Sequence, residues 1–214
     1  TTRLLIDYGL APTSPPRYPS EAPPVSDAIF THTHIDHIGM APWLVGNHDT
    51  NLHATTLTAA LSGLMWKDTY KVSSIEGYPL PWDRRDEDYA KDAWQTHHYR
   101  EWAQHDNWRW QLHPAGHVPG AAMIEIETPT HRILHSGDLD TRDSPTTFGA
   151  KPVECDILLL ESTYAGKEHP NRAEEEARFL AKVVEVVERG GIAIVPAFAS
   201  GRGQDVLKIL HDSG

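Results

Sequence analysis

The run His32-Thr33-His34-Ile35-Asp36-His37 constrains this chain more than any other feature of its sequence. It follows a short strand-like segment, residues 27–30, so its first residues are expected to be extended. Side chains at positions i and i+2 of an extended chain point the same way, which lets His32 and His34 share one metal ion. A turn in the middle of the run would bring Asp36 and His37 to a neighbouring point. Imidazole and carboxylate groups in this combination favour a borderline metal such as zinc.

A site for two neighbouring metal ions, as this spacing predicts, is typical of a hydrolase. A catalytic metal keeps an open coordination position and makes its water acidic enough to act as a nucleophile near neutral pH. Two ions about 3.5–4 Å apart can hold a bridging hydroxide and neutralise the charge that develops on a phosphate. The alternative is a solvated polar loop with a chance cluster of histidines. Four ligand-type residues within six positions, directly after a strand pattern, disfavour that alternative.

Three further residues lie where such a site needs them. His117 sits in a glycine-containing loop between two predicted strands, and Asp138 follows the predicted strand 132–135, where its two oxygens could bridge two metals. Asp7 ends the first predicted strand and either orients a ligand histidine or caps a turn. The other ten histidines lack this context and are expected to be surface or structural residues: His48, His53, His97, His98, His105, His113, His131, His135, His169 and His211.

The rest of the sequence predicts strands that first follow one another closely and later alternate with helices. Strands are expected at residues 2–6, 27–30, 51–54, 108–112, 121–127, 132–135, 156–160 and 192–195, and helices at 39–44, 56–70, 171–189 and 204–210. The apolar runs 156–160 and 192–195 are typical of buried strands. Residues 11–24 predict a loop, and the tryptophan-rich stretch 76–110 is expected to be helix and loop that cover a sheet. This order of elements indicates an α/β fold.

Composition narrows the class of protein. The chain is 39% hydrophobic and 23% charged, which fits a globular protein, and no apolar stretch approaches the roughly 20 residues that span a bilayer. The single cysteine, Cys155, excludes an intrachain disulfide and a cysteine-rich zinc site, and it favours a cytoplasmic location. The net charge of −11 disfavours a nucleic-acid partner, although bound metal ions would add local positive charge.

Together these motifs resemble the metallo-β-lactamase superfamily, whose signature is HxHxDH followed by a separate histidine and a separate aspartate. Two later segments are similar to the β-CASP nuclease group of that superfamily, and most of all to its RNA-processing branch. The segment 160–166, with His-Pro-Asn-Arg at 169–172, resembles the acidic motif that opens the β-CASP region. The segment 196–205 resembles the Pro-x-Phe-x-x-Gly-Arg-x-Gln-Glu run of the same group.

The resemblance implies a four-layer αββα sandwich with the metals at one edge. Residues 1–165 would form the N-terminal part of the metallo-β-lactamase core, and residues 166–214 the start of a β-CASP domain. One of two divalent ions, expected to be Zn²⁺, would be held by His32, His34, His117 and Asp138, and the other by Asp36, His37 and the shared Asp138. Asp36 and Glu161 would be catalytic, Glu161 by orienting a histidine that protonates the leaving oxygen, and Arg202 would bind substrate.

One departure from the family pattern concerns the second metal. The last ligand histidine of this group comes late in the sequence, and after Gln204 only His211 follows here, in the first turns of a predicted helix. The chain also opens abruptly on a strand-like run. We therefore expect it to be a fragment of a longer protein.

The resemblance implies a metal-dependent ribonuclease of RNA processing or decay, in which a hydroxide bridging two metals attacks phosphorus. Single-stranded RNA is the expected partner, with DNA left open, and a homodimer or a processing complex is the expected assembly. Two alternatives remain: a hydrolase of the same fold that acts on thioesters or lactones, and a non-catalytic RNA-binding scaffold subunit. The β-CASP-like motifs disfavour the first alternative, and the intact ligand set disfavours the second.

Overall fold

The computed structural model describes residues 3–213 and places the strands in two sheets. The first sheet is entirely parallel, with its strands in the order β1 (Leu5–Ile6), β2 (Asp27–Ile29), β3 (Asn51–Thr55) and β4 (Trp94–His97). The second sheet has the order β5 (Ala103–His105), β6 (Trp108–Pro114), β7 (Ala122–Glu127), β8 (Arg132–His135) and β9 (Ile157–Leu159). Neighbouring strands within this second sheet are antiparallel, except that β9 runs parallel to β8. Of the strand expected at residues 2–6, Thr2 lies outside the described residues.

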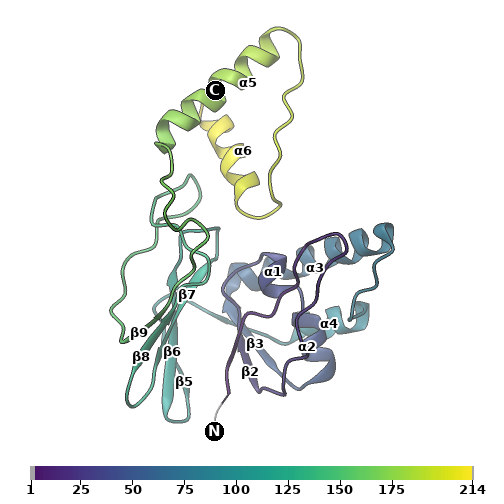
Figure 1. The fold of residues 1–214 in the computed structure, drawn as a ribbon, viewed down its shortest axis with the longest axis vertical. Helices are drawn as coiled ribbons and strands as arrows, with labels where there is room; N and C mark the ends of the chain where they lie inside the picture. The colour runs from purple at the N-terminus through teal and green to yellow at the C-terminus, as the bar shows by residue number, and fades with distance from the viewer. Residues whose placement is uncertain (1–2, 214) are drawn as a thin grey trace.

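The two sheets face each other, and helices cover the far side of the first sheet (Figure 1). These helices are α1 (Ile35–Ile38), α2 (Ala41–Asn47), α3 (Thr56–Glu76) and α4 (Arg84–Asp92). The later helices α5 (Arg172–Glu188) and α6 (Arg202–Asp212) pack on each other beyond one end of the sheets (Figure 1). The predicted α/β class is therefore confirmed. Within residues 3–213, three of the four expected layers are present, because no helix covers the outer face of the second sheet.

Alternation along the central strands divides the core into two parts. Ala28 and Phe30 pack toward the helices, whereas Ile29 points between the sheets and packs with Trp110 and Ile124. This period of two is the side-chain geometry of an extended strand. Burying a large apolar side chain stabilises a fold by about 1.5–3 kcal/mol, so this short strand contributes on both of its faces. It thereby fixes where the chain leaves the sheet, at the start of the histidine run.

Two buried tryptophans hold the chain just after that run. The indole of Trp66, on α3, donates a hydrogen bond to the carbonyl of Ile38 at 2.9 Å. The indole of Trp82 donates to the carbonyl of Gly39, also at 2.9 Å. Both rings are almost fully buried, so each indole N–H would be left unpaired without its carbonyl partner. Trp66 on α3 and Trp82 in the tryptophan-rich stretch therefore help to fix the end of α1 and the residues that this helix carries.

The structure corrects the interpretation of residues 76–110. We expected helix and loop outside the sheets, and α4 agrees with that, but β4 joins the first sheet and β5 joins the second. Trp94 is paired with Leu52 in the first sheet, and its ring packs edge-on against Phe30. Strands of three or four residues with mixed polar and aromatic side chains carry too few periods for sequence to separate them from a loop.

Two predictions of buried strands are wrong. β9 forms within residues 156–160 as an edge strand paired only with β8 among the described residues, but its three residues are exposed. Residues 192–195 form no strand, and Ile192 and Ile194 are both 87% exposed. An apolar run becomes a buried strand only when neighbouring elements cover it, and no described residues do so here. No helix within residues 3–213 is both long enough and apolar enough to cross a membrane.

Candidate metal centre

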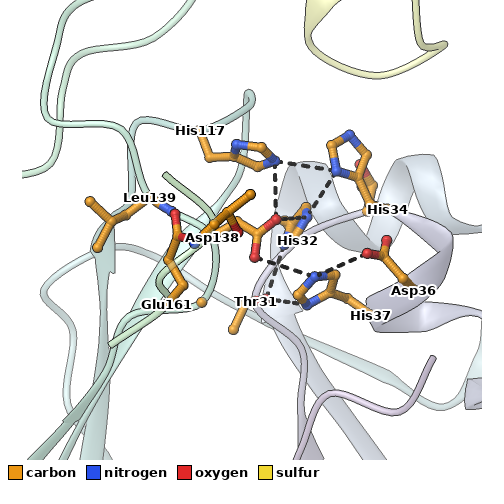
Figure 2. A network of polar contacts seen from close by, with 12 residues as sticks. Thr31, His32, His34, Asp36, His37, His117, Asp138, Leu139 and Glu161 are labelled. Carbon is orange, nitrogen blue, oxygen red and sulfur yellow. Dashed lines mark hydrogen bonds and ion pairs between the residues drawn. The ribbon is translucent and has the colours of Figure 1, made fainter. Parts of the chain in front are cut away.

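The ligand-type residues predicted from the sequence come together at one end of the two sheets (Figure 2). His32 and His34 follow β2, while Asp36 and His37 belong to the single turn of α1. The second sheet supplies the two remaining side chains, because His117 lies in the loop between β6 and β7 and Asp138 follows β8. Strands from both sheets end here, so side chains distant in sequence meet without a long loop.

One group consists of three imidazoles and a carboxylate. His32, His34, His117 and Asp138 each offer a ligand atom, and all four atoms lie within 4.8 Å of one another. His34 Nδ1 lies 3.0 Å from His32 Nε2 and 3.2 Å from His117 Nε2. Asp138 Oδ2 lies 3.6 Å from His117 Nε2 and 3.9 Å from His32 Nε2. Three nitrogens and one oxygen gathered around a common point form a donor set that suits a divalent metal such as zinc.

A second group surrounds the ring of His37. Its Nε2 atom lies 3.5 Å from Asp138 Oδ1 and 3.7 Å from Asp36 Oδ2. Asp138 therefore turns one oxygen toward the first group and the other oxygen toward the second (Figure 2). This is the arrangement in which one carboxylate can be shared between two neighbouring cations. The second group has fewer ligand atoms than the first within residues 3–213.

Asp7 and Thr31 fix the orientation of the His37 and His32 rings through contacts with their Nδ1 atoms. Asp7 Oδ2 accepts hydrogen bonds from His37 Nδ1 and from the Thr31 hydroxyl, each at 2.7 Å. Because that hydroxyl gives its proton to Asp7, it can accept one from His32 Nδ1, which lies 3.0 Å away. Each histidine then carries its proton on Nδ1 and turns the lone pair of Nε2 toward the ligand group. Asp7 takes up a left-handed backbone conformation with φ of 55°, which aspartate tolerates better than most residues.

Thr31 is a functional candidate that the sequence reasoning missed. It is 1% exposed, and its backbone N–H also donates to Asp7 Oδ1 at 2.7 Å. Its position immediately before the first histidine was the only available signal. A threonine at the end of a strand is too common for that signal to identify it.

Burial keeps the central ring neutral. Burial lowers the pKa of His32 well below its usual value, and the neighbouring rings of His37 and His34 act in the same direction. Burial also lowers the pKa of His117, with His34 adding to the effect. For His37, burial is outweighed by the hydrogen bond to Asp7, which raises the pKa. A neutral imidazole is the form that binds a metal, so burial favours the metal-binding form of His32 and His117.

Close backbone packing positions the run as a whole. The N–H of Tyr8 donates to the carbonyl of His37 at 2.7 Å, and the N–H of Leu10 donates to that of Ile35 at 3.1 Å. Between them, a Cβ on Gly9 would lie 1.9 Å from the backbone of Asp36, so only glycine allows this approach. The segment after β1 therefore serves as a backbone support for α1.

The other two predicted site residues lie outside the ligand groups. Glu161 accepts hydrogen bonds from the backbone N–H groups of Thr163 at 2.8 Å and Leu139 at 3.4 Å, which places it beside the Asp138 loop. Burial would raise its pKa, but these hydrogen bonds lower it, so Glu161 is ionised. The Arg202 side chain is largely exposed and pairs with Asp205 at 3.6 Å rather than with the ligands.

Comparisons with known proteins agree with this geometry. The family model described as the Metallo-beta-lactamase superfamily matches residues 1–157. The cleavage and polyadenylation specificity factor subunit 3 of Dictyostelium discoideum is 35% identical over 198 residues, which are 90% of this chain and 26% of that protein. The RNase aCSPSF2 of Saccharolobus solfataricus is 32% identical over 220 residues, covering 98% of this chain and 44% of the relative.

A third relative, the probable RNase MJ4 of Methanocaldococcus jannaschii, is 31% identical over 99% of this chain and 51% of its own length. The chain thus spans between about a quarter and a half of these relatives. Their names confirm the resemblance to the β-CASP group of RNA-processing nucleases. With the matched family model and the gathered histidines and aspartates, they lead to one conclusion: this chain belongs to the metallo-beta-lactamase superfamily.

Proposed function

We propose that the protein is a metal-dependent nuclease that hydrolyses phosphodiester bonds of RNA, in RNA processing or decay. The observation that carries the proposal is the carboxylate of Asp138, which faces a three-histidine group with one oxygen and His37 with the other. A donor set divided in this way suits two neighbouring cations, which can together stabilise the attacking and leaving oxygens of an in-line displacement at phosphorus. The names of the relatives, among them an RNase and a cleavage factor subunit, support RNA as the substrate.

The proposal assigns a role to each predicted residue. His32, His34, His117 and Asp138 hold one zinc ion, and Asp36, His37 and the shared Asp138 hold the other. Bound zinc ions acidify a water molecule and neutralise charge on a phosphate. Asp7 keeps the proton of His37 on Nδ1, which leaves the Nε2 lone pair for the metal.

The exposed rim of the site is where substrate would enter. His32 is fully buried, whereas Asp36 is more than half exposed and Asp138 is partly exposed. The phosphate would therefore approach from the side of Asp36 and Asp138. Arg202 would contact the RNA backbone, because its side chain is largely exposed even though it pairs with Asp205. The ionised Glu161 would orient a histidine that donates a proton. Residues 166–214 would form the start of the β-CASP domain, which binds substrate.

Because the net charge is −11, tight binding of RNA by electrostatic attraction to the protein surface alone is unfavourable. The local charge of the metal centre would then supply much of the attraction for a phosphate. We also propose that the substrate is single-stranded RNA and that the protein acts as a homodimer or within a processing complex. The proposed location is the cytoplasm, which the single free cysteine supports.

The test uses the full-length protein and a labelled single-stranded RNA. We expect cleavage by the wild type, and loss of cleavage with a chelator or in Asp36→Ala. Asp88→Ala is the matched control, because Asp88 is an exposed helical aspartate remote from the centre, and it should cleave normally. Cleavage that survives both chelator and Asp36→Ala would overturn the proposal. So would an inert wild type that turns over a thioester, or one that binds RNA without cutting it.

A further inference from the structure

The segment 198–205 reaches the metal centre from the far end of the sequence. Its Ser200 is 4% exposed, and the Thr33 hydroxyl donates a hydrogen bond to the Ser200 hydroxyl at 2.8 Å. Thr33 lies between two of the ligand histidines, so this contact touches the core of the HxHxDH run. The next residue, Gly201, has φ of 89°, and a Cβ there would lie 2.3 Å from Val118 Cγ1. Only glycine permits so close an approach to the residue beside His117.

Ser200 also faces the one histidine of the run that Asp7 and Thr31 do not hold. The Ser200 carbonyl oxygen lies 3.4 Å from His34 Nε2. A carbonyl can only accept a hydrogen bond, so this contact places the proton of His34 on Nε2. The lone pair of His34 Nδ1 then points at His32 Nε2 and His117 Nε2, 3.0 and 3.2 Å away. Ser200 thus does for His34 what Asp7 does for His37.

A second path from the same segment leads to the loop that carries His117. Asp205, on α6, is 6% exposed, and it accepts hydrogen bonds from Thr146 Oγ1 at 2.7 Å and Ser144 Oγ at 3.1 Å. In the same turn, Thr147 Oγ1 donates to the carbonyl of Gly116 at 2.8 Å. The buried carboxylate of Asp205 therefore fixes the 144–147 turn, and this turn fixes Gly116, the residue before His117.

Asp205 is itself fixed by a cation. The guanidinium of Arg172, at the start of α5, lies 3.2 Å from Asp205 Oδ2. A buried carboxylate without partners would be costly, and here two hydroxyls, Arg172 and the more distant Arg202 satisfy it. The charge of Asp205 is thus accounted for by contacts that join α5, α6 and the 144–147 turn, with no part left for binding a metal.

We propose that Ser200 and Asp205 are positioning residues of the metal centre, which set the orientation of His34 and of the His117 loop and thereby raise the affinity for zinc. The C-terminal segment is then a component of the metal site as well as a neighbour of the substrate. This inference rests on the zinc centre of the proposed function, but it does not depend on RNA as the substrate. Outer partners of ligand histidines commonly change metal affinity by about 10–100-fold.

The test measures zinc affinity of the full-length protein by competition with a chromogenic chelator. Ser200→Ala and Thr33→Val keep the Ser200 carbonyl but each removes one end of the buried hydroxyl contact that holds this carbonyl against His34. Each is therefore expected to weaken zinc binding by about tenfold. Their double variant should be no weaker than either single variant, because both remove the same contact. Asp205→Ala is expected to weaken binding by a similar factor through the His117 loop.

Thr50→Val is the matched control, because the Thr50 hydroxyl is equally buried and donates to the Val25 carbonyl at 2.7 Å, just before the start of β3. It should leave zinc affinity unchanged even if it lowers stability. The visible absorption of the cobalt-substituted protein adds a second readout: we expect it to change in Ser200→Ala and to match the wild type in Thr50→Val.

Two results would overturn the inference and are distinguishable. If the wild type binds zinc, and Ser200→Ala and Asp205→Ala bind it within twofold with an unchanged cobalt spectrum, the positioning role is wrong and the centre stands. If the wild type binds no zinc, the zinc centre of the proposed function fails, and the positioning role fails with it.

Discussion

Two histidine clusters lie at opposite ends of β2 and use the same kinds of residue for different purposes. The metal centre gathers around His32, three residues beyond the end of the strand. The second, which we call the inter-sheet cluster, consists of Asp27, His53, His97 and His105. It begins at the first residue of β2 and lies against Trp110 between the sheets. Both clusters are partly or fully buried, and both combine imidazoles with a carboxylate.

The clusters differ in what their ring nitrogens face. In the inter-sheet cluster, His53 Nε2 lies 2.9 Å from Asp27 Oδ1, and His53 Nδ1 lies 3.0 Å from His97 Nε2. With the proton of His53 on Nε2, His97 can donate to His53, so both contacts of the His53 ring pair a donor with an acceptor. In the metal centre, lone pairs of three rings face one another and a carboxylate. The two clusters therefore differ in the orientation of their rings and not in their composition, and among the described residues only the metal centre presents a donor set that could hold a metal ion.

Replacing the shared carboxylate should have the largest effect. Asp138→Asn keeps the shape of the side chain but removes the charge that faces both ligand groups. We expect the full-length protein to lose at least one bound zinc ion. RNA cleavage should slow by about a hundredfold or more, because two metal ions lower the barrier to hydrolysis by several kcal/mol. Zinc content after dialysis and the single-turnover cleavage rate measure this.

Asp27→Asn is the control for that experiment, because it makes the same change in the inter-sheet cluster. It should keep its zinc and its cleavage rate. Equal zinc loss in both variants would remove the distinction between the clusters.

The sequence predicted the ligand groups because they depend on local order. The spacing of His32, His34, Asp36 and His37 follows from one strand end and one helical turn. His117 and Asp138 could be added because His117 lies in the loop between two predicted strands and Asp138 follows a third, and strand ends of a two-sheet core meet at an edge. The α/β class followed from the same strands, most of which formed within a residue or two of their predicted bounds.

What the sequence could not predict depends on contacts between distant residues. His53 was grouped with surface or structural histidines, and only the pairing of β3 with β2 and β4 brings it to Asp27 and His97. Ser200 belonged to a recognised motif, but its contact with Thr33 spans 167 residues. The apolar run 192–195 shows the opposite error, because its hydrophobicity said nothing about whether a neighbour would cover it.

Removing the support of one ligand should have a smaller effect than removing the ligand. Asp7→Asn weakens the hydrogen bond that holds His37 Nδ1, and it removes the charge that raises the pKa of His37. We expect zinc affinity to fall by about 10–100-fold, as for other carboxylates behind ligand histidines. Chelator competition measures the change, with Asp88→Ala as an exposed control. Unchanged affinity would mean that Asp7 only caps the turn after β1.

Breaking the inter-sheet cluster should affect stability and leave metal binding alone. Asp27→Ala removes the acceptor of His53 Nε2 and the partner of His105 Nε2, which lie 2.9 and 3.3 Å from its oxygens. Leaving buried donors unpaired costs about 1–3 kcal/mol, so the urea midpoint should fall while zinc affinity stays at the wild-type value. A loss of zinc in this variant would show that the two ends of β2 are coupled.

The smallest expected effect is the pH response of the inter-sheet cluster. Burial lowers the pKa of His97 below its usual value of 6.5, and the adjacent His53 acts in the same direction. As the pH falls through 6.5, the unfolded chain takes up a proton that folded His97 declines, so stability is lost toward acid. For Asp27, burial is outweighed by the hydrogen bond from His53, which lowers the pKa, so its contribution is lost only below its usual value of 3.8. Between about pH 7.5 and 5.5 His97 is therefore expected to contribute to the response, whereas Asp27 is not.

Urea midpoints of the zinc-free protein at about pH 7.5 and 5.5 test this for the wild type and His97→Gln. The wild-type midpoint should fall more steeply, because the glutamine side chain of the variant cannot take up a proton in either state. Burial also lowers the pKa values of His32 and His117, but both proteins share these rings, so their contribution cancels in the difference. His131→Gln, on the exposed turn between β7 and β8, should follow the wild type. Parallel slopes for the wild type and His97→Gln would show that His97 accepts a proton as readily when folded as when unfolded, which its burial argues against.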